Sequence, residues 1–152
     1  MAYTNAEARQ DILDIVAEAI DELATALAAL GAAYELLDEH HADDLEEQLF
    51  RPVQVAYGRA KRTHTNFAQR AALATQTFEA ASPGAPSTGA KGFVEVAVER
   101  VGAADVVLST LQDSMLPVEV GDPELRAGLA EVRELIGGLP GRAREVVRTL
   151  GR

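Results

Sequence analysis

The side chains best able to bind a ligand lie in the string Arg-Ala-Lys-Arg-Thr-His-Thr-Asn at 59–66 and at Asp105. Thr63 occupies a position where the heptad pattern predicts a large apolar residue, and a polar group in a core needs hydrogen-bond partners. Asp105 stands in an otherwise apolar run and could face that spot, where Arg62 or His64 would balance its charge. We favour a structural polar pair that fixes helix register over a small-ligand or anion pocket. The candidate ligand-binding residues are Arg62, Thr63, His64 and Asp105.

A second cluster, Asp-Glu-His-His-Ala-Asp-Asp at 38–44, places two imidazoles among carboxylates at a predicted helix turn. His40, His41 and Asp44 are the candidate metal ligands. Helical bundles that hold catalytic metal do so inside, with Glu-x-x-His pairs from two helices, and no glutamate stands three residues before any histidine here. We therefore favour a solvated turn and expect no cofactor and no tightly held transition metal.

Motifs for covalent or cofactor chemistry are weak in this chain. No Ser, His and acid spacing and no paired-carboxylate motif is strong enough to name a reaction. Gly84 and Gly89 have the spacing of a phosphate-binding loop, but Ala90 precedes Lys91 and no strand leads into the loop. The residues leave enzymatic activity open but favour a protein that is not an enzyme.

The elements that would position these residues are helices. Apolar residues from Leu13 to Leu37 step by three and four, which is the period of a coiled-coil seam. Similar spacing and turn signals predict helices at about 5–41, 43–81, 89–116, 123–137 and 141–150. Pro52 is expected in the first turn of the second long helix, and 82–89 reads as the linker. The predicted fold class is all-α: an up-down antiparallel four-helix bundle with long heptad-patterned helices and a short C-terminal helix, in one domain spanning 1–152.

Charge and composition narrow the classes of partner. The net charge is −10, which disfavours nucleic acid and anionic membrane surfaces, and the absence of cysteine excludes disulfides and thiolate zinc sites. Neither a signal peptide nor an apolar run of about 20 residues is visible, so the expected location is the cytoplasm. The acidic first third should pair with the basic second third along an antiparallel hairpin. The expected ion pairs are Glu18 or Glu22 with Arg62, Asp14 with Arg70, and Glu35 with Arg51.

These observations predict a non-enzymatic helical-bundle protein that acts through protein–protein interaction or assembly. A stripe of Phe50, Val53 and Tyr57 at helical spacing is expected to drive self-association into a homo-oligomer. The alternative is a small-ligand- or metal-binding bundle, possibly enzymatic, with a polar site around Thr63, His64 and Asp105.

Overall fold

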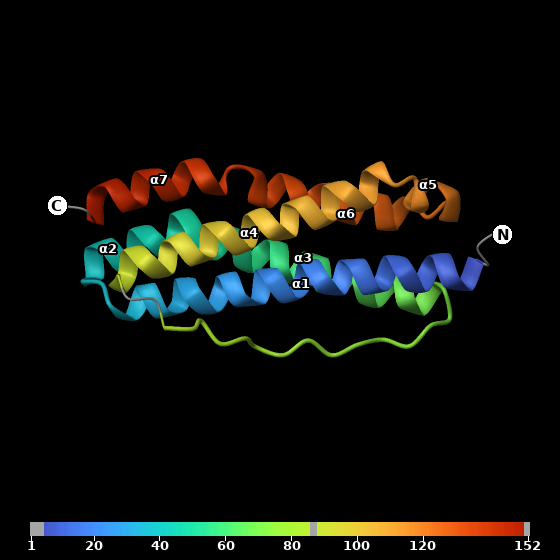
Figure 1. Cartoon of the computed structure of the whole chain (residues 1–152), viewed down its shortest axis with the longest axis horizontal. Helices are drawn as coiled ribbons and strands as arrows, with labels where there is room; N and C mark the ends of the chain where they lie inside the picture. Colours follow the sequence, from blue (N-terminus) through green and yellow to red (C-terminus); the bar gives the residue numbers. More distant parts are fainter. Residues whose placement is uncertain (1–4, 86–87, 151–152) are drawn as a thin grey trace.

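The computed structural model describes residues 5–85 and 88–150, and this part of the chain is helical without β-strands. Figure 1 shows the helices side by side along one long axis. In chain order they are α1 (Asn5–Glu35), α2 (Glu39–Leu45), the π-helical turn η1 (Glu46–Phe50), α3 (Arg51–Arg70), α4 (Gly89–Asp113), α5 (Leu116–Val120), α6 (Pro123–Gly137) and α7 (Leu139–Leu150). The all-α prediction is confirmed at this level.

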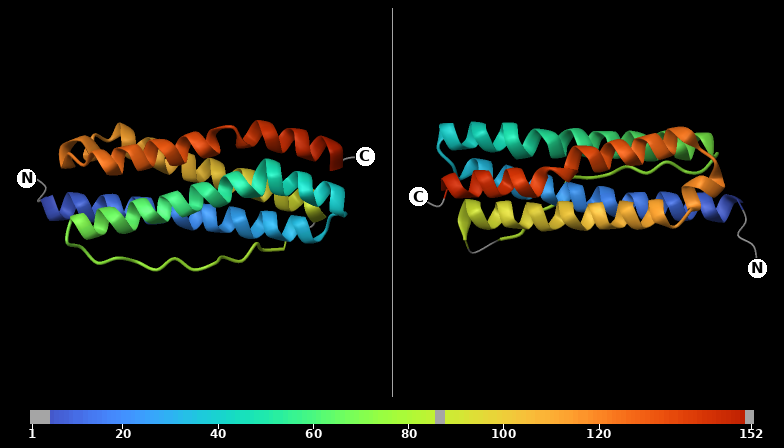
Figure 2. Two further views of the ribbon diagram at one scale, coloured as in Figure 1. Left: turned by 180° about the vertical axis from the view of Figure 1, so that it is seen from behind. Right: turned by 90° about the horizontal axis from the view of Figure 1, so that it is seen from above.

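Each long helix packs against antiparallel neighbours. The first helix, α1, contacts α3 and α4, while α6 contacts the same two helices from the other side and α7 continues along α4 and η1. The views in Figures 1 and 2 show α3 and α4 running in the same direction, opposite to α1 and to α6 and α7. Thus α3 and α4 lie diagonally across the molecule, with α1 and α6 between them.

The connection between α3 and α4 is an extended strap. The second long helix, predicted to reach residue 81, instead ends at Arg70, and residues 71–85 run back along the outside of the helices (Figure 1). We call residues 71–85 the strap; residues 86 and 87 of the predicted linker lie outside the described residues. The two helices that the strap joins, α3 and α4, therefore run in the same direction. In a strict up-down topology, each helix would run opposite to the one before it in the chain.

Chain reach explains why the helix stops early. The continuous helix 39–70 has 32 residues and is about 48 Å long. Eighteen residues separate Arg70 from Gly89, and in extended form they span up to about 60 Å, which is enough to return. Had the helix continued to 81, the seven remaining residues would span only about 25 Å.

A Schellman motif terminates α3 without glycine. Ala72 adopts the left-handed conformation with φ 56°, the Leu73 N–H donates to the Ala68 carbonyl, and the Ala72 N–H donates to that of Gln69. This is the pattern in which a left-handed residue closes a helix, usually with glycine. An alanine there carries no sequence signal for a helix end. The periodicity of the apolar residues therefore predicted a helix that continues too far.

The first helix is also shorter than predicted. It ends at Glu35 rather than 41, and Asp38 begins α2 by accepting the Ala42 N–H at its backbone carbonyl. His40 and His41 therefore lie in the first turn of α2 rather than at the end of the first helix, where they were predicted. Beyond α4, the short helix α5 was not predicted, α6 has the predicted bounds, and α7 begins two residues earlier than expected.

Apolar side chains from α1, η1, α3, α4, α6 and α7 fill the interior as one cluster. Val53 is fully buried in it, and Phe50 and Tyr57 are half-buried and pack against it. The stripe that was predicted to drive self-association therefore packs against the core of its own chain. This follows because η1 and α3 pack against α1, and η1 also packs against α7. Among the described residues, no helix is both long and apolar enough to cross a membrane.

Candidate functional site

Thr63 of α3 lies in tight contact with Gly128 of α6. It is buried, and its hydroxyl donates to the Arg59 carbonyl at 2.8 Å while accepting from Arg59 Nη1 at 3.2 Å. A β-carbon placed on Gly128 of α6 would lie only 2.3 Å from Thr63 Oγ1. Thr63 is on the seam because a glycine faces it, and its hydroxyl is satisfied within its own helix.

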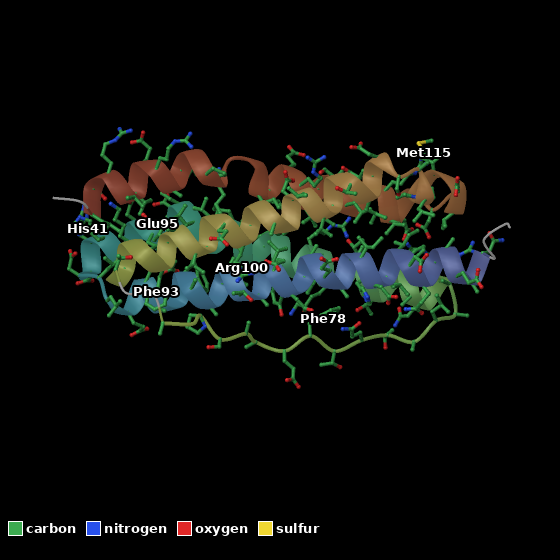
Figure 3. All side chains as sticks on the ribbon, viewed as in Figure 1. His41, Phe78, Phe93, Glu95, Arg100 and Met115 are labelled. Carbon is green, nitrogen blue, oxygen red and sulfur yellow. The ribbon has the colours of Figure 1, made fainter. Side chains whose placement is uncertain are left out.

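His64 lies between α3, α1 and the strap. Its Nε2 donates to the Leu13 carbonyl at 3.1 Å, and Phe78 of the strap packs edge-to-face on its ring with centroids 5.0 Å apart. Figure 3 shows Phe78 where the strap passes the helices. Burial lowers the pKa of His64, offset in part by the bond to Leu13 and the charge of Asp14. Its Nδ1 is buried and lacks a hydrogen-bond partner among the described residues, and burial of this kind favours the neutral form of the ring.

Asp105 pairs with α6 rather than with α3. Arg133 Nε donates to it at 2.8 Å, and Arg133 Nη1 donates to Gln112 of the same α4 at 2.9 Å. The hydrogen bond to Asp105 raises the pKa of Arg133, and both side chains are about one-third exposed. The prediction that Asp105 meets Arg62, His64 or Thr63 was wrong, because the strap places α4 diagonally opposite α3. The four predicted ligand-binding residues therefore face separate neighbours, and Arg62 is exposed on the surface.

The histidine turn forms no metal cluster. His41 Nδ1 donates to Asp38, and the rings of His40 and His41 meet edge-to-face with centroids 5.4 Å apart. Within residues 5–85 and 88–150, no group of three or more His, Asp and Glu side chains converges as metal ligands would. His40, His41 and Asp44 lie on the surface of α2 without the shared geometry that a metal site requires.

The predicted ion pairs between α1 and α3 are replaced by others. Glu22 of α1 pairs with Arg100 of α4 at 3.3 Å, in the gap where Figure 3 labels Arg100. Arg51 pairs locally with Glu46 at 3.7 Å, and Arg70 binds Asp122 and Glu124 ahead of and within α6, each at 2.8 Å. Arg59, which pairs with Glu131 at 2.7 Å, and Arg70 thus bind acidic residues of α6 and its N-cap rather than those of α1.

Asp122 combines two tasks at the start of α6. Its carboxylate accepts the Leu125 N–H at 2.9 Å, as an N-cap does, and binds two guanidinium nitrogens of Arg70. Partial burial favours a higher pKa for Asp122, but the hydrogen bonds from Arg70 and Leu125 outweigh it and lower the pKa overall. Asp122 before Pro123 and Glu124 is typical of a helix start and so favours this cap, whereas no local pattern indicates Arg70 as its partner.

Neither a protein-family model, nor a curated protein, nor a solved structure matches this chain.

A charged cleft of about 750 Å³ lies between η1, α3, α6 and α7. Pro52 has no N–H, so the Gln48 carbonyl four residues earlier lacks its helical donor. Arg142 Nε supplies that donor at 3.0 Å, and its guanidinium passes so close to Gly138 that a β-carbon there would lie 2.7 Å from it. The cleft is thus organised around a structural bond between α7 and the proline-disrupted turn. Its lining residues are Glu47, Gln48, Arg51, Pro52, Val55, Glu131, Glu134, Leu135 and Arg142.

A second concavity, a groove of about 480 Å³, lies between α4 and α7. Val94 and Val98 of α4 and Ala143 and Val147 of α7 supply apolar walls. Glu95 stands on the α4 rim, visible in Figure 3, and Arg144 and Arg148 on the α7 rim. Such an apolar groove with charged edges suits a protein side chain better than a polar metabolite.

Proposed function

We propose that this protein is a non-catalytic helical protein that acts by binding other protein chains, including a second copy of itself. The observation that carries this proposal is the distribution of its side chains. Thr63, His64 and Asp105 each interact with separate groups of their own chain. Large apolar side chains, by contrast, stay exposed on the outside, where a partner chain would bury them. Those among the described residues are Leu36, Val55, Val106, Met115 and Val118.

Three of the exposed apolar residues follow one another along a single part of the chain. Val106 lies on α4, Met115 precedes α5, and Val118 lies on α5. Figure 3 labels Met115 at the outer edge of the molecule. A surface at α4 and α5 is accordingly the best supported place for protein binding.

The scaffold for this function is, we propose, a four-helix bundle of antiparallel neighbours. Its four rods are α1, the continuous helix α2–η1–α3, α4, and the pair α6 and α7. The contacts of α1 with α3 and α4, and of α6 with the same two helices, support this arrangement. The strap adds one long crossover, which known bundles accommodate.

Two measurements on the purified wild-type protein test the proposal. Sedimentation over the micromolar range is expected to show association that increases with concentration. A thermal-shift screen of anions, divalent metals and metabolites is expected to find no saturable ligand. A stoichiometric small ligand whose binding is lost in His64→Ala or Asp105→Ala would overturn the proposal in favour of a ligand-binding bundle.

A further inference from the structure

The outward face of α4 carries seven residues spaced three or four apart. This spacing places them in one stripe along the helix. None of the seven is buried, and Val106, the most exposed large apolar side chain of the described residues, is 63% exposed. We call these residues the α4 stripe: Lys91, Glu95, Val98, Gly102, Val106, Ser109 and Asp113.

Two pairs of positions in the α4 stripe are complementary about its central residue, Gly102. Val98 and Val106 stand four residues on either side of Gly102. Lys91 and Asp113 stand eleven residues on either side of it and have opposite charges. A surface that meets its own copy about a two-fold axis must be self-complementary in this sense, because residue i then contacts residue j and j contacts i.

We propose that a second copy of this chain docks on the α4 stripe, antiparallel, with the two-fold axis at Gly102. This inference rests on the proposed function, for which it names the partner and the surface. In the dimer Lys91 of each copy faces Asp113 of the other, and Val98 faces Val106. Within the described residues, neither Lys91 nor Asp113 takes part in an ion pair, although the charge of Asp113 contributes to the raised pKa of Arg133 in the same chain.

The groove beside the stripe provides a place for the most exposed valine. Val98 belongs both to the α4 stripe and to the wall of the groove of about 480 Å³ between α4 and α7. Because Val106 of the second copy lies over Val98, its side chain enters that apolar groove, and the two-fold axis repeats the contact. Two exposed valines are thereby buried among Val94, Ala143 and Val147.

The shape of the molecule permits this contact along the whole helix. Figure 2, in the view from above, shows α4 along one edge of the molecule with the other helices behind it. The helix has 25 residues, so the stripe is part of a rod about 37 Å long. A β-carbon at Gly102 would meet no atom within 4 Å, so the centre of the stripe is open to an approaching helix.

The first test compares two aspartate variants by sedimentation. Val106→Asp places a carboxylate in the proposed contact and is expected to weaken association by about tenfold or more. Ala130→Asp is the control: Ala130 is exposed on α6, outside the α4 stripe and outside the exposed apolar residues named above, so this variant should leave association unchanged. Circular dichroism checks that both variants keep their helix content.

Charge reversal tests the antiparallel direction. Lys91→Glu and Asp113→Lys, made singly, each place like charges opposite each other and should weaken association. The double variant should restore it. The two residues stand 22 positions apart on one helix, about 33 Å, so they cannot compensate within one chain.

Cross-linking tests the position of the axis without relying on a disrupted contact. The chain has no cysteine, so Gly102→Cys carries a single thiol that should form disulfide-linked dimers rapidly on oxidation. Gly31→Cys, at a position equally free of atoms within 4 Å, is the matched control and should form no disulfide-linked dimer, because residue 31 lies outside the proposed contact.

The outcomes separate this inference from the proposed function. A wild type that stays monomeric at high micromolar concentration overturns the α4 dimer. An association that Val106→Asp and the charge reversals leave unchanged, with no Gly102→Cys cross-link, also overturns it while leaving protein binding in place. A monomeric wild type also removes self-association from the proposed function and leaves binding of other protein chains, whereas the small-ligand result described above overturns the proposed function as a whole.

Discussion

Replacing Gly128 by alanine probes the packing of α3 against α6 at a single point. The added β-carbon would lie 2.3 Å from Thr63 Oγ1, 2.7 Å from its Cγ2 and 3.1 Å from its Cβ. Thr63 is β-branched, so rotating its side chain does not clear both branches, and it breaks the hydroxyl bond to the Arg59 carbonyl. One of the two helices must therefore shift.

The magnitude follows from two opposing effects. Overpacking a core by a methyl group destabilises by about 1–3 kcal/mol. Alanine also favours the helix over glycine by about 1 kcal/mol, which hides part of that loss. Gly31→Ala measures the second effect alone, because Gly31 is helical and its β-carbon would meet no atom within 4 Å. We expect Gly128→Ala to be less stable than Gly31→Ala by about 1–3 kcal/mol.

Urea unfolding followed by circular dichroism measures these free energies. Thr63→Ala removes both branches that the new methyl group meets. The double variant Gly128→Ala Thr63→Ala should recover more than half of the difference, which appears as coupling in a double-mutant cycle. A gain in stability for Gly128→Ala as large as that for Gly31→Ala would refute the close approach of α3 and α6.

Four further changes test other parts of the structure. Ala72→Gly should stabilise by about 1 kcal/mol in urea unfolding, because a non-glycine residue pays about that much for a left-handed conformation; an unchanged or lower stability contradicts the helix end described above. The stability of the wild type should fall as pH drops below about 6.5, since burial lowers the folded pKa of His64 and the unfolded chain binds the proton first; His64→Leu should lose this part of the slope. Asp122→Ala should cost about 1–3 kcal/mol at neutral pH, and the stability that Asp122 supplies should disappear as pH falls through its lowered folded pKa, which thermal unfolding at two pH values detects. Asp105→Ala should cost no more than about 1 kcal/mol because its pair with Arg133 is partly exposed; a loss of several kcal/mol would show that the pair is buried in solution.

Periodicity and cap residues were sufficient to predict most helices. The bounds of α6 follow from the sequence Asp122-Pro123-Glu124 and the glycines after Ile136, since a cap, a first-turn proline and a glycine stop act locally. The start of α4 was likewise predicted from the turn residues before it. Helix ends that are set by residues next to them in the sequence can therefore be predicted from the sequence.

The candidate site depended on long-range topology, which no local pattern encodes. The sequence indicated that Asp105 needs a partner. That partner, Arg133, comes from α6 because the strap places α4 diagonally opposite α3. Thr63 was recognised as out of place on the seam, and the signal that explains it is Gly128 in the interior of another helix. A glycine that lowers helix propensity without ending the helix was the available sign of a close contact.

The strap divides the chain into two covalently joined but separable halves. One half, ending at Arg70, supplies α1 and α3; the other, beginning at Gly89, supplies α4, α6 and α7, and the two meet mainly through α1 against α4 and α3 against α6. Lengthening a connection of this type costs only about 0.6 kcal/mol for each doubling of its length. The exposed positions 79 and 80 on the strap therefore offer a place to insert a reporter, or to cut the gene and let two fragments reassemble by complementation.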